Sequence, residues 1–452
     1  MSQPLTRHNR PRQVLDAIAA ANADLSEADR TAKFDKLATS PYRFFRGTNH
    51  LYWSDVWHDW RFALFGGLPE TQTWLQGDAH AYNFGAYGHH DDDVRYGMDD
   101  FDDALIGDYQ YDLWRLATSL VLDVRENVEL SRKGTRRALR ALLESYHDEL
   151  VGHTRGETPA AVTLDTAKGF LKPFMQEVAD KHSRERMLDK WTQQGAEGRR
   201  FAERPDKLVG LPAHIASQLR KAIEEEYRQT LQSGRSEAER GHFRVKDMAR
   251  RINAGTGSLG RERFYVLIEG GRDHEHDDVI LDVKEQAPPE GWRQMTRDEK
   301  QAWRNAFPHE GVRHAAAFCA IAEHPDIYLG WLHLGDKVFS VRERSPFKED
   351  FPTHKIDGAK PYRKLVRNWG RILAREHLRG ARALHQDDPA RFARSVCTRL
   401  DGRLDHFVEM ISMFAVSYAD CVTQDYRTFV EAKPDSSGST LGAESNGRAQ
   451  RG

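Results

Sequence analysis

Residues 77–113 read GDAHAYNFGAYGHHDDDVRYGMDDFDDALIGDYQYDL and hold the densest set of polar side chains in the sequence. Asp78 follows an apolar run, Asn83 comes five residues later, and Asp100 and Asp102 follow within the next twenty residues. Carboxylates at this density repel one another, and a bound cation with oxygen ligands is the usual compensation. Acidic clusters on loops can also be solvated turns and helix caps. The spacing of the amide and the carboxylates favours a magnesium site that serves phosphoryl transfer.

A glycine-rich segment lies much further along the chain. Gly255, Gly257 and Gly260 form the pattern G-x-G-x-x-G, with Ser258 inside it. The β-branched and aromatic run RERFYVLIEG (261–270) follows, so the segment is expected to join two strands instead of opening a helix. Glycines in such a loop let backbone N–H groups approach phosphates. The alternative for these residues taken alone is an ordinary hairpin turn.

The segment VILDVKEQ (279–286) alternates as a strand does. Its apolar residues at odd positions are expected on one face, whereas Asp282 and Lys284 share the other. Lys284 is then expected to project into a cleft and pair with the α and β phosphates of a nucleotide, unless it is a solvated strand lysine. Glu299 and Glu310 are the two candidates for its acidic partner.

The two segments resemble the aminoglycoside and choline phosphotransferases, which are relatives of the protein kinases. GDAHAYN and DFDDALIGDYQYDL are similar to their catalytic loop HGDxHxxN and their metal segment IDFxxA. The resemblance implies ATP and Mg²⁺ as cofactors, Asp78 as the catalytic base, and Asn83 and Asp100 as metal ligands. It implies Asp102 as a second ligand or an outer-shell support. Asp112 is implied as an anchor that binds back to the catalytic loop.

Two positions depart from the pattern of those enzymes. Gln76 stands where a histidine usually precedes Gly-Asp, and Asp282 stands where a small apolar residue usually covers the adenine.

The resemblance implies a small hydroxyl-bearing molecule as the acceptor. Two alternatives stay open, namely transfer of the nucleotidyl group and binding of ATP without any transfer.

The order of the segments is reversed relative to those enzymes, because here the catalytic loop precedes the glycine-rich segment. WGRILAREH (369–377) is similar to the helix that follows the hinge in the phosphotransferases, and it follows the expected hinge strand VFSVRER (338–344). The parts therefore occur in cyclic order, which indicates a circular permutation.

The whole chain also resembles a bacterial family known only as a domain of unknown function. Its marks are an SPFxFxRG-like segment, GDxHxxNFG, a DFD segment and a VKE strand. These correspond here to SPYRFFRG (40–47), GDAHAYNFG (77–85), DDFDDA (99–104) and DVKEQ (282–286). Arg46, within the first of them, is expected to contact a phosphate or a carboxylate.

We therefore expect an α+β fold of the protein-kinase-like, two-lobed type in circularly permuted order, with a mostly helical catalytic lobe and a small antiparallel-sheet lobe. The expected units are an N-terminal helical segment (1–60), the catalytic-loop and helical lobe (61–242), the glycine-loop sheet lobe (243–345), a helical return that completes the catalytic lobe (346–432) and a disordered tail (433–452). Residues 113–235 are expected to be mostly helical, and SPYRFFRG is expected to be a packed turn.

Composition narrows the classes of partner. The chain has 452 residues, with 67 basic and 69 acidic side chains, so it lacks the basic excess that binding to a nucleic-acid backbone requires. No window resembles a signal peptide or an apolar membrane span. The 3 cysteines are few and far apart, which suits a reducing compartment. We expect a protein of the cytoplasm, with no nucleic-acid or membrane partner.

A metallophosphoesterase is the main rival enzyme class, because Gly-Asp-x-His after a strand is typical of such sites. That class needs a downstream Gly-Asn-His motif, whereas the Asn-His pair of this chain, Asn49-His50, lies upstream. Two histidine-rich loops, at 89–90 and 274–276, are expected to be solvated loop tips instead of metal sites.

Overall fold

The computed structural model describes residues 9–88, 93–158, 160–196, 198–232, 243–253, 260–270 and 277–433. It has a mixed α/β architecture, and the strands within these ranges pair in antiparallel fashion. The expected tail after residue 433 lies outside the described residues. In the described part of the chain, no helix combines the length and the apolar character needed to cross a bilayer.

Four helices come first: α1 (Arg10–Ala21), α2 (Glu27–Leu37), α3 (Pro41–Gly47) and α4 (Asn49–Val56). The expectation of a packed turn at SPYRFFRG is wrong, because this segment forms α3. The Ser40 hydroxyl caps the helix by accepting a hydrogen bond from the backbone N–H of Arg43 at 3.2 Å, and Pro41 lies in the first turn. Proline is tolerated there because the first N–H groups of a helix have no acceptor within it.

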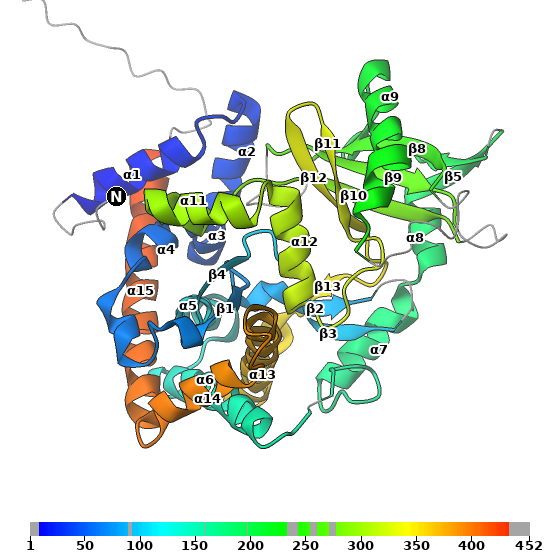
Figure 1. Cartoon of the computed structure of the whole chain (residues 1–452). Helices are drawn as coiled ribbons and strands as arrows, with labels where there is room; N and C mark the ends of the chain where they lie inside the picture. Colours follow the sequence, from blue (N-terminus) through cyan, green and yellow to red (C-terminus); the bar gives the residue numbers. More distant parts are fainter. Residues whose placement is uncertain are drawn as a thin grey trace, which may run out of the picture.

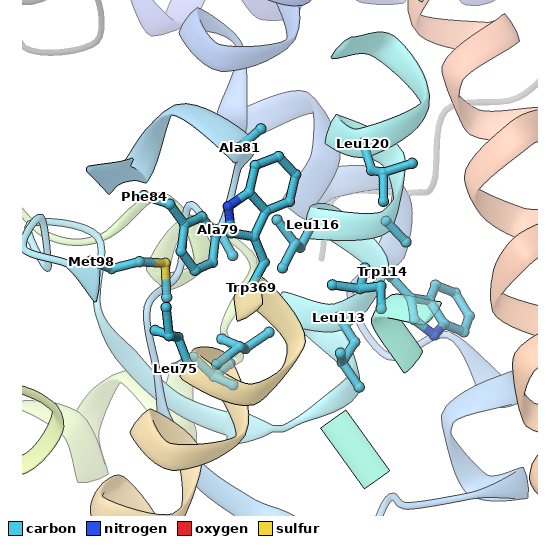
Figure 2. Close-up of a cluster of buried hydrophobic side chains, with 14 of the residues drawn as sticks. Leu75, Ala79, Ala81, Phe84, Met98, Leu113, Trp114, Leu116, Leu120 and Trp369 are labelled. Carbon is cyan, nitrogen blue, oxygen red and sulfur yellow. The ribbon is translucent and has the colours of Figure 1, made fainter. Parts of the chain in front are cut away.

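Five further helices form the helical body: α5 (Gln110–Asp123), α6 (Arg132–Thr154), α13 (Ala359–Leu384), α14 (Arg391–Leu400) and α15 (Leu404–Ala432). Helix α13 packs along α6, and α15 packs along α5 and α1 (Figure 1). Figure 2 shows that apolar side chains of α5 and α13 meet those of residues 75–84, where the rings of Trp369 and Phe84 stack with centroids 5.3 Å apart. The polar loop that contains Asp78 therefore rests on a close-packed core.

Two small antiparallel sheets frame residues 76–83, which we call the Asp78 loop. Their strands are β1 (Gln72–Leu75) with β4 (Leu105–Asp108), and β2 (Phe84–Tyr87) with β3 (Arg95–Met98) and β13 (Glu349–Asp350). Strand β1 leads into the Asp78 loop, and its partner β4 follows residues 99–104. This pairing brings the two polar segments side by side.

A six-stranded antiparallel sheet forms the second part of the molecule, in the order β11-β12-β10-β9-β8-β7. Its strands are β7 (Leu208–Val209), β8 (Val245–Arg251), β9 (Arg263–Ile268), β10 (Val279–Glu285), β11 (Gly330–Leu334) and β12 (Lys337–Glu343). Helices α11 (Arg297–Ala306) and α12 (Glu310–Ile321) connect β10 to β11, and α9 (Ala213–Lys221) and α10 (Arg228–Thr230) precede β8.

Strand β10 shows the predicted alternation. Its residues 279, 281 and 283 are buried in an apolar cluster with Leu219 of α9, on one face of the sheet. Asp282 and Lys284 lie on the opposite face and line a cavity. The periodicity of two in the sequence therefore predicted the face from which Lys284 projects.

Residues 113–235 are less uniformly helical than expected. Helices α7 (Leu171–Lys181) and α8 (Arg184–Trp191) are followed by a hairpin of β5 (Thr192–Gly195) and β6 (Gly198–Phe201), and β7 joins the large sheet. Trp191 and Phe201 pack with Tyr265 and Ile280 of the sheet. Strands this short contain too few residues for their alternation to be distinguished from a helical pattern.

Candidate active site

One cavity of about 370 Å³ lies between the helical body and the six-stranded sheet. Asp78, Asn83, Asp100, Asp102 and Lys284 all line it. Lys284 and Asp102 are separated by 182 residues in the sequence but form an ion pair. The structure therefore places residues from both polar segments around a single space.

Backbone contacts hold the Asp78 loop in place. The Asp112 carboxylate accepts hydrogen bonds from the backbone N–H groups of Gln76 at 2.6 Å and Gly77 at 3.0 Å, so its expected role as an anchor is confirmed. The Gln76 side chain accepts from the backbone N–H of Asp78 at 2.9 Å and donates to the backbone carbonyl of Asp100 at 2.7 Å. The Gln76 side chain thus ties the two polar segments together.

Asp78 is held by a buried arginine that the sequence analysis missed. Arg115 Nε donates to Asp78 Oδ1 at 2.7 Å, and Arg115 Nη2 contacts the same oxygen. Desolvation raises the pKa of Asp78 to about 7, although the charge of Arg115 opposes this shift. The Asp78 Oδ2 atom accepts no hydrogen bond from a described residue. An arginine within the apolar face of a helix is the signal that identifies such a partner.

Arg46 lies beside Asp78, and its predicted contact with a carboxylate does not appear among the described residues. Its Nε donates to His80 Nε2 at 3.1 Å, and its guanidinium lies 5.8 Å from the centre of the Tyr82 ring. His80 is buried, and desolvation together with the charge of Arg46 holds its pKa well below its usual range. His80 is therefore neutral and carries its proton on Nδ1.

Two oxygen groups in the cavity fit a hard cation. The Asn83 side chain donates through Nδ2 to the carbonyl of Asp78 at 3.1 Å, which leaves its Oδ1 without a donor among the described residues. The Asp100 carboxylate likewise accepts no hydrogen bond and forms no ion pair among the described residues, although its charge acts on Lys348. Within the described ranges, no group of three or more His, Cys, Asp and Glu side chains could hold a metal ion by itself. Mg²⁺ commonly binds through one or two carboxylates together with substrate phosphates and water, so the donors present suit that mode.

Lys284 pairs with Asp102, and neither Glu299 nor Glu310 contacts it. Glu299 instead accepts a hydrogen bond from the backbone of Thr296, and Glu310 pairs with Arg313. Both candidates named from the sequence are therefore wrong. They lie nearby in the chain, whereas the actual partner comes from a segment that only the tertiary fold brings to β10.

Further contacts occupy the Asp102 carboxylate. Gln286 Nε2 donates to Asp102 Oδ1 at 3.2 Å, and His314 Nε2 lies 3.4 Å from the same oxygen. Lys284 and His314 hold the pKa of Asp102 well below its usual range despite its desolvation. Because both oxygens are engaged by protein groups, this geometry favours an outer-shell role for Asp102 over direct metal ligation.

The sheet side of the cavity is charged. Arg263 Nε donates to Asp282 Oδ1 at 2.7 Å, and Arg263 Nη2 contacts Asp282 Oδ2. Tyr265 lies beside this pair in the cavity wall. The Arg263 guanidinium therefore compensates for the charge of the Asp282 carboxylate in the cavity wall.

The remaining predicted residues lie mostly outside the described residues. These are Gly255, Gly257 and Ser258, together with the histidine-rich loops at 89–90 and 274–276. Gly260 is described and has a φ of +92°, a conformation that favours glycine.

The amino-acid sequence matches one protein family over residues 26–432, and that family is described as "uncharacterized protein conserved in bacteria (DUF2252)". The chain belongs to this family. No curated protein and no solved structure matches the chain. The DUF2252 match contains all the site residues discussed above, so the cavity lies within the region that defines family membership.

Proposed function

We propose that this DUF2252 protein is an ATP- and Mg²⁺-dependent phosphotransferase that acts on a hydroxyl group of a small-molecule acceptor. The observation that carries the proposal is the meeting of Lys284, Asp78 and Asp100 in one cavity, although they come from distant parts of the chain. An ammonium group, a candidate base and a metal-binding carboxylate are the parts that phosphoryl transfer requires.

The strand order supports a kinase-like site for the nucleotide. The glycine-rich segment lies between β8 and β9, and Lys284 lies on β10, the third strand of this run. Protein kinases hold ATP phosphates with a glycine loop and a lysine on the third strand. We propose that the fold is a circularly permuted, two-lobed kinase-like fold, because the Asp78 loop precedes these strands in the sequence.

Each residue then has a defined role in the proposed reaction. Asp78 Oδ2 accepts the proton of the acceptor hydroxyl, while Arg115 holds Oδ1 and so positions the carboxylate. Asn83 and Asp100 bind Mg²⁺, which neutralises charge on the transferred phosphoryl group. Lys284 binds the nucleotide phosphates.

Parallel incubation with α-labelled and γ-labelled ATP tests the proposal. The protein, MgCl₂ and a small-molecule extract of bacterial cells would be incubated, and labelled products separated by chromatography. We expect a new labelled product from γ-labelled ATP alone. Label from α-labelled ATP would show nucleotidyl transfer, and no new product with either nucleotide would show a module that does not transfer. Both results would contradict the proposal.

Nucleotidyl transfer is the second candidate because of one observation. The Arg263–Asp282 ion pair places charge where kinases cover the adenine with an apolar side chain. A nucleotide that avoids this contact would bind in the opposite orientation and present its α phosphate to Asp78.

A further inference from the structure

Three nitrogen-bearing side chains gather where the N-terminal helices meet the cavity. Lys33 comes from α2, His50 comes from α4, and Arg261 precedes β9, and all three line the cavity. Neither Lys33 nor Arg261 forms an ion pair with any described residue. Their positive charges therefore lack a direct counter-ion within the described structure.

The neighbouring carboxylates are already engaged. Glu290 pairs with Arg293 at 2.9 Å. Asp103 accepts hydrogen bonds from the Asn49 side chain at 3.3 Å and from the backbone N–H of Glu290 at 3.2 Å. Lys33 and Arg261 therefore have no direct ion-pair partner among the described residues at this end of the cavity.

Burial makes this arrangement costly without a ligand. Lys33 is only 9% exposed, and desolvation lowers its pKa although Glu290 and Asp103 oppose the shift. His50 Nε2 and Asn49 Oδ1 are also buried without a hydrogen-bond partner, and Glu290 Oε2 has only its ion pair with Arg293. Buried polar groups in native proteins are nearly always satisfied, so their number here points to a polar ligand.

A side-chain contact joins the N-terminal helices to this end of the sheet. A Cβ atom added at Gly260 would lie 2.2 Å from Leu25 Cδ2, so the Leu25 side chain, in the turn between α1 and α2, packs against the residue before Arg261. This contact places α2, which carries Lys33, beside the segment that carries Arg261. Lys33 is buried and Arg261 is half-buried, so neither is a fully solvated side chain.

We propose that Lys33, Arg261 and His50 form a subsite for an oxyanion, namely a phosphate or carboxylate group carried by the acceptor. This inference rests on the proposed function, because it identifies the acceptor as an acidic hydroxyl compound. Lysine and arginine supply the charge, and the neutral His50 ring can donate a further hydrogen bond through Nε2. Asn49 Oδ1 accepts from a hydroxyl of the same molecule.

The surroundings favour the acceptor over the nucleotide as the source of the oxyanion. The charges that act most strongly on Lys33 belong to Glu290, Arg261, Arg293 and Asp103. Asp103 also acts electrostatically on Asp78, so one carboxylate influences both the subsite and the candidate base. Lys284, which we assign to the nucleotide phosphates, is paired with Asp102 instead. The acceptor must reach Asp78, and the subsite and Asp78 line the same cavity and share Asp103 as an electrostatic neighbour.

Two calorimetric titrations test the subsite. In the first, the full chain with MgCl₂ is titrated with a non-hydrolysable ATP analogue. In the second, the analogue-saturated protein is titrated with inorganic phosphate. We expect Lys33→Met and Arg261→Gln each to weaken phosphate binding at least about tenfold and to change the affinity for the analogue less than twofold. Lys33→Arg should retain phosphate binding. The matched control is Lys172→Met, an exposed lysine on α7.

The outcomes separate this inference from the function on which it rests. Unchanged phosphate binding in folded Lys33→Met and Arg261→Gln would overturn the subsite. Equal weakening of the analogue and of phosphate would assign the cations to the nucleotide and overturn the acceptor assignment. Phosphate binding that depends on Lys33 in a protein that does not bind the analogue would support the subsite and reject the ATP-dependent function.

Discussion

At the scale of single residues, the cavity is organised by ion pairs that are partly or fully buried. Arg115 is fully buried and holds one oxygen of Asp78, while Lys284 and Asp102 neutralise each other across the two parts of the molecule. Such pairs orient their members, because breaking one leaves an uncompensated charge in a poorly solvated place. Mutations in the cavity therefore need isosteric replacements if chemistry is to be separated from stability.

Asp78→Asn tests the candidate base. The amide has nearly the same shape but cannot accept a proton, so we expect phosphoryl transfer to fall at least about 100-fold while nucleotide binding stays within a few-fold of wild type. Steady-state rates with γ-labelled ATP and equilibrium titration measure the two effects. Asp336→Asn, in the exposed turn between β11 and β12, is the control. Full activity in Asp78→Asn would remove Asp78 from the mechanism.

Asp100→Ala tests the metal site. Because Asp100 supplies a cavity carboxylate that forms no ion pair with a described residue, its loss should weaken Mg²⁺-dependent ATP binding at least about tenfold. Titration of ATP with and without MgCl₂ measures the metal-dependent part of the affinity. Binding of Mg-ATP as tight as in wild type would show that the metal ligands have been assigned wrongly.

His50 predicts a pH dependence of stability. Burial lowers its pKa from 6.5 to about 3 in the folded protein. His50 therefore binds a proton below pH 6.5 in the unfolded chain, but only below about pH 3 in the folded protein. The stabilisation is complete above pH 6.5 and declines toward pH 3, at up to about 1.4 kcal/mol per pH unit.

Urea unfolding between pH 7 and pH 4 measures this dependence. We expect His50→Gln to reduce the slope of the unfolding free energy against pH in that interval. The exposed His214→Gln should leave the slope unchanged. Identical slopes for His50→Gln and wild type would contradict burial of the neutral ring.

At the scale of elements, short segments between strands position the site. The turn after β1 brings Asp78 next to residues 99–104, and its geometry depends on Gly77. This residue has a φ of +83°, and a Cβ atom there would lie 1.9 Å from the backbone oxygen of Asp103. Helix α3 also depends on its first residues. Ser40 caps the helix and Pro41 lies in its first turn, whereas the aromatic cluster by itself indicated a packed turn.

Gly77→Ala should therefore destabilise the protein by at least about 2 kcal/mol, because it combines a disfavoured backbone angle with a steric clash. Chemical denaturation measures the change. Gly210→Ala is the control, since a Cβ atom at Gly210 meets nothing within 4 Å. Equal stability of the two variants would show that the Asp78 loop adapts freely.

At the scale of the whole molecule, the two ends of the described chain are tied together. Arg10 of α1 donates to Asp55 of α4 and to Asp425 of α15, at 2.8 and 2.7 Å for the closest atoms. Figure 1 shows α1 beside α15, and the helical body therefore closes around its first and last helices. This closure completes the helical body on which the Asp78 loop rests.

Arg10→Met should lower the free energy of unfolding by about 3 kcal/mol, because it leaves two mostly buried carboxylates without their cation. The three side chains are 15%, 11% and 5% exposed, so solvent screens them only partly. Arg12→Met is the control, since the Arg12–Asp16 pair is solvent-exposed and should contribute nothing measurable. Equal denaturation midpoints for both variants would contradict the proposed closure.

How well the sequence predicted a feature depends on how far apart in the chain the interacting residues lie. The alternation of β10 and most long helices depend on nearby residues, and the sequence predicted them. The anchor role of Asp112, which binds residues 35 and 36 positions away, was implied by the resemblance instead. The short strands at 192–209 and the capped helix at 41–47 were missed, because their local signals are weak or point to another structure. The glycine-rich pattern stays a prediction.

The sequence by itself pointed to Asp78, Asp100 and Lys284 as cavity residues, to the face on which Lys284 projects and to the family to which the chain belongs. Only the tertiary structure decided that Asp102 pairs with Lys284, that Arg115 holds Asp78 and that Lys33 joins the cavity wall. The physical reason is distance along the chain. Periodicity and capping act over a few residues, whereas an ion pair between segments 182 residues apart forms only after packing has brought them together.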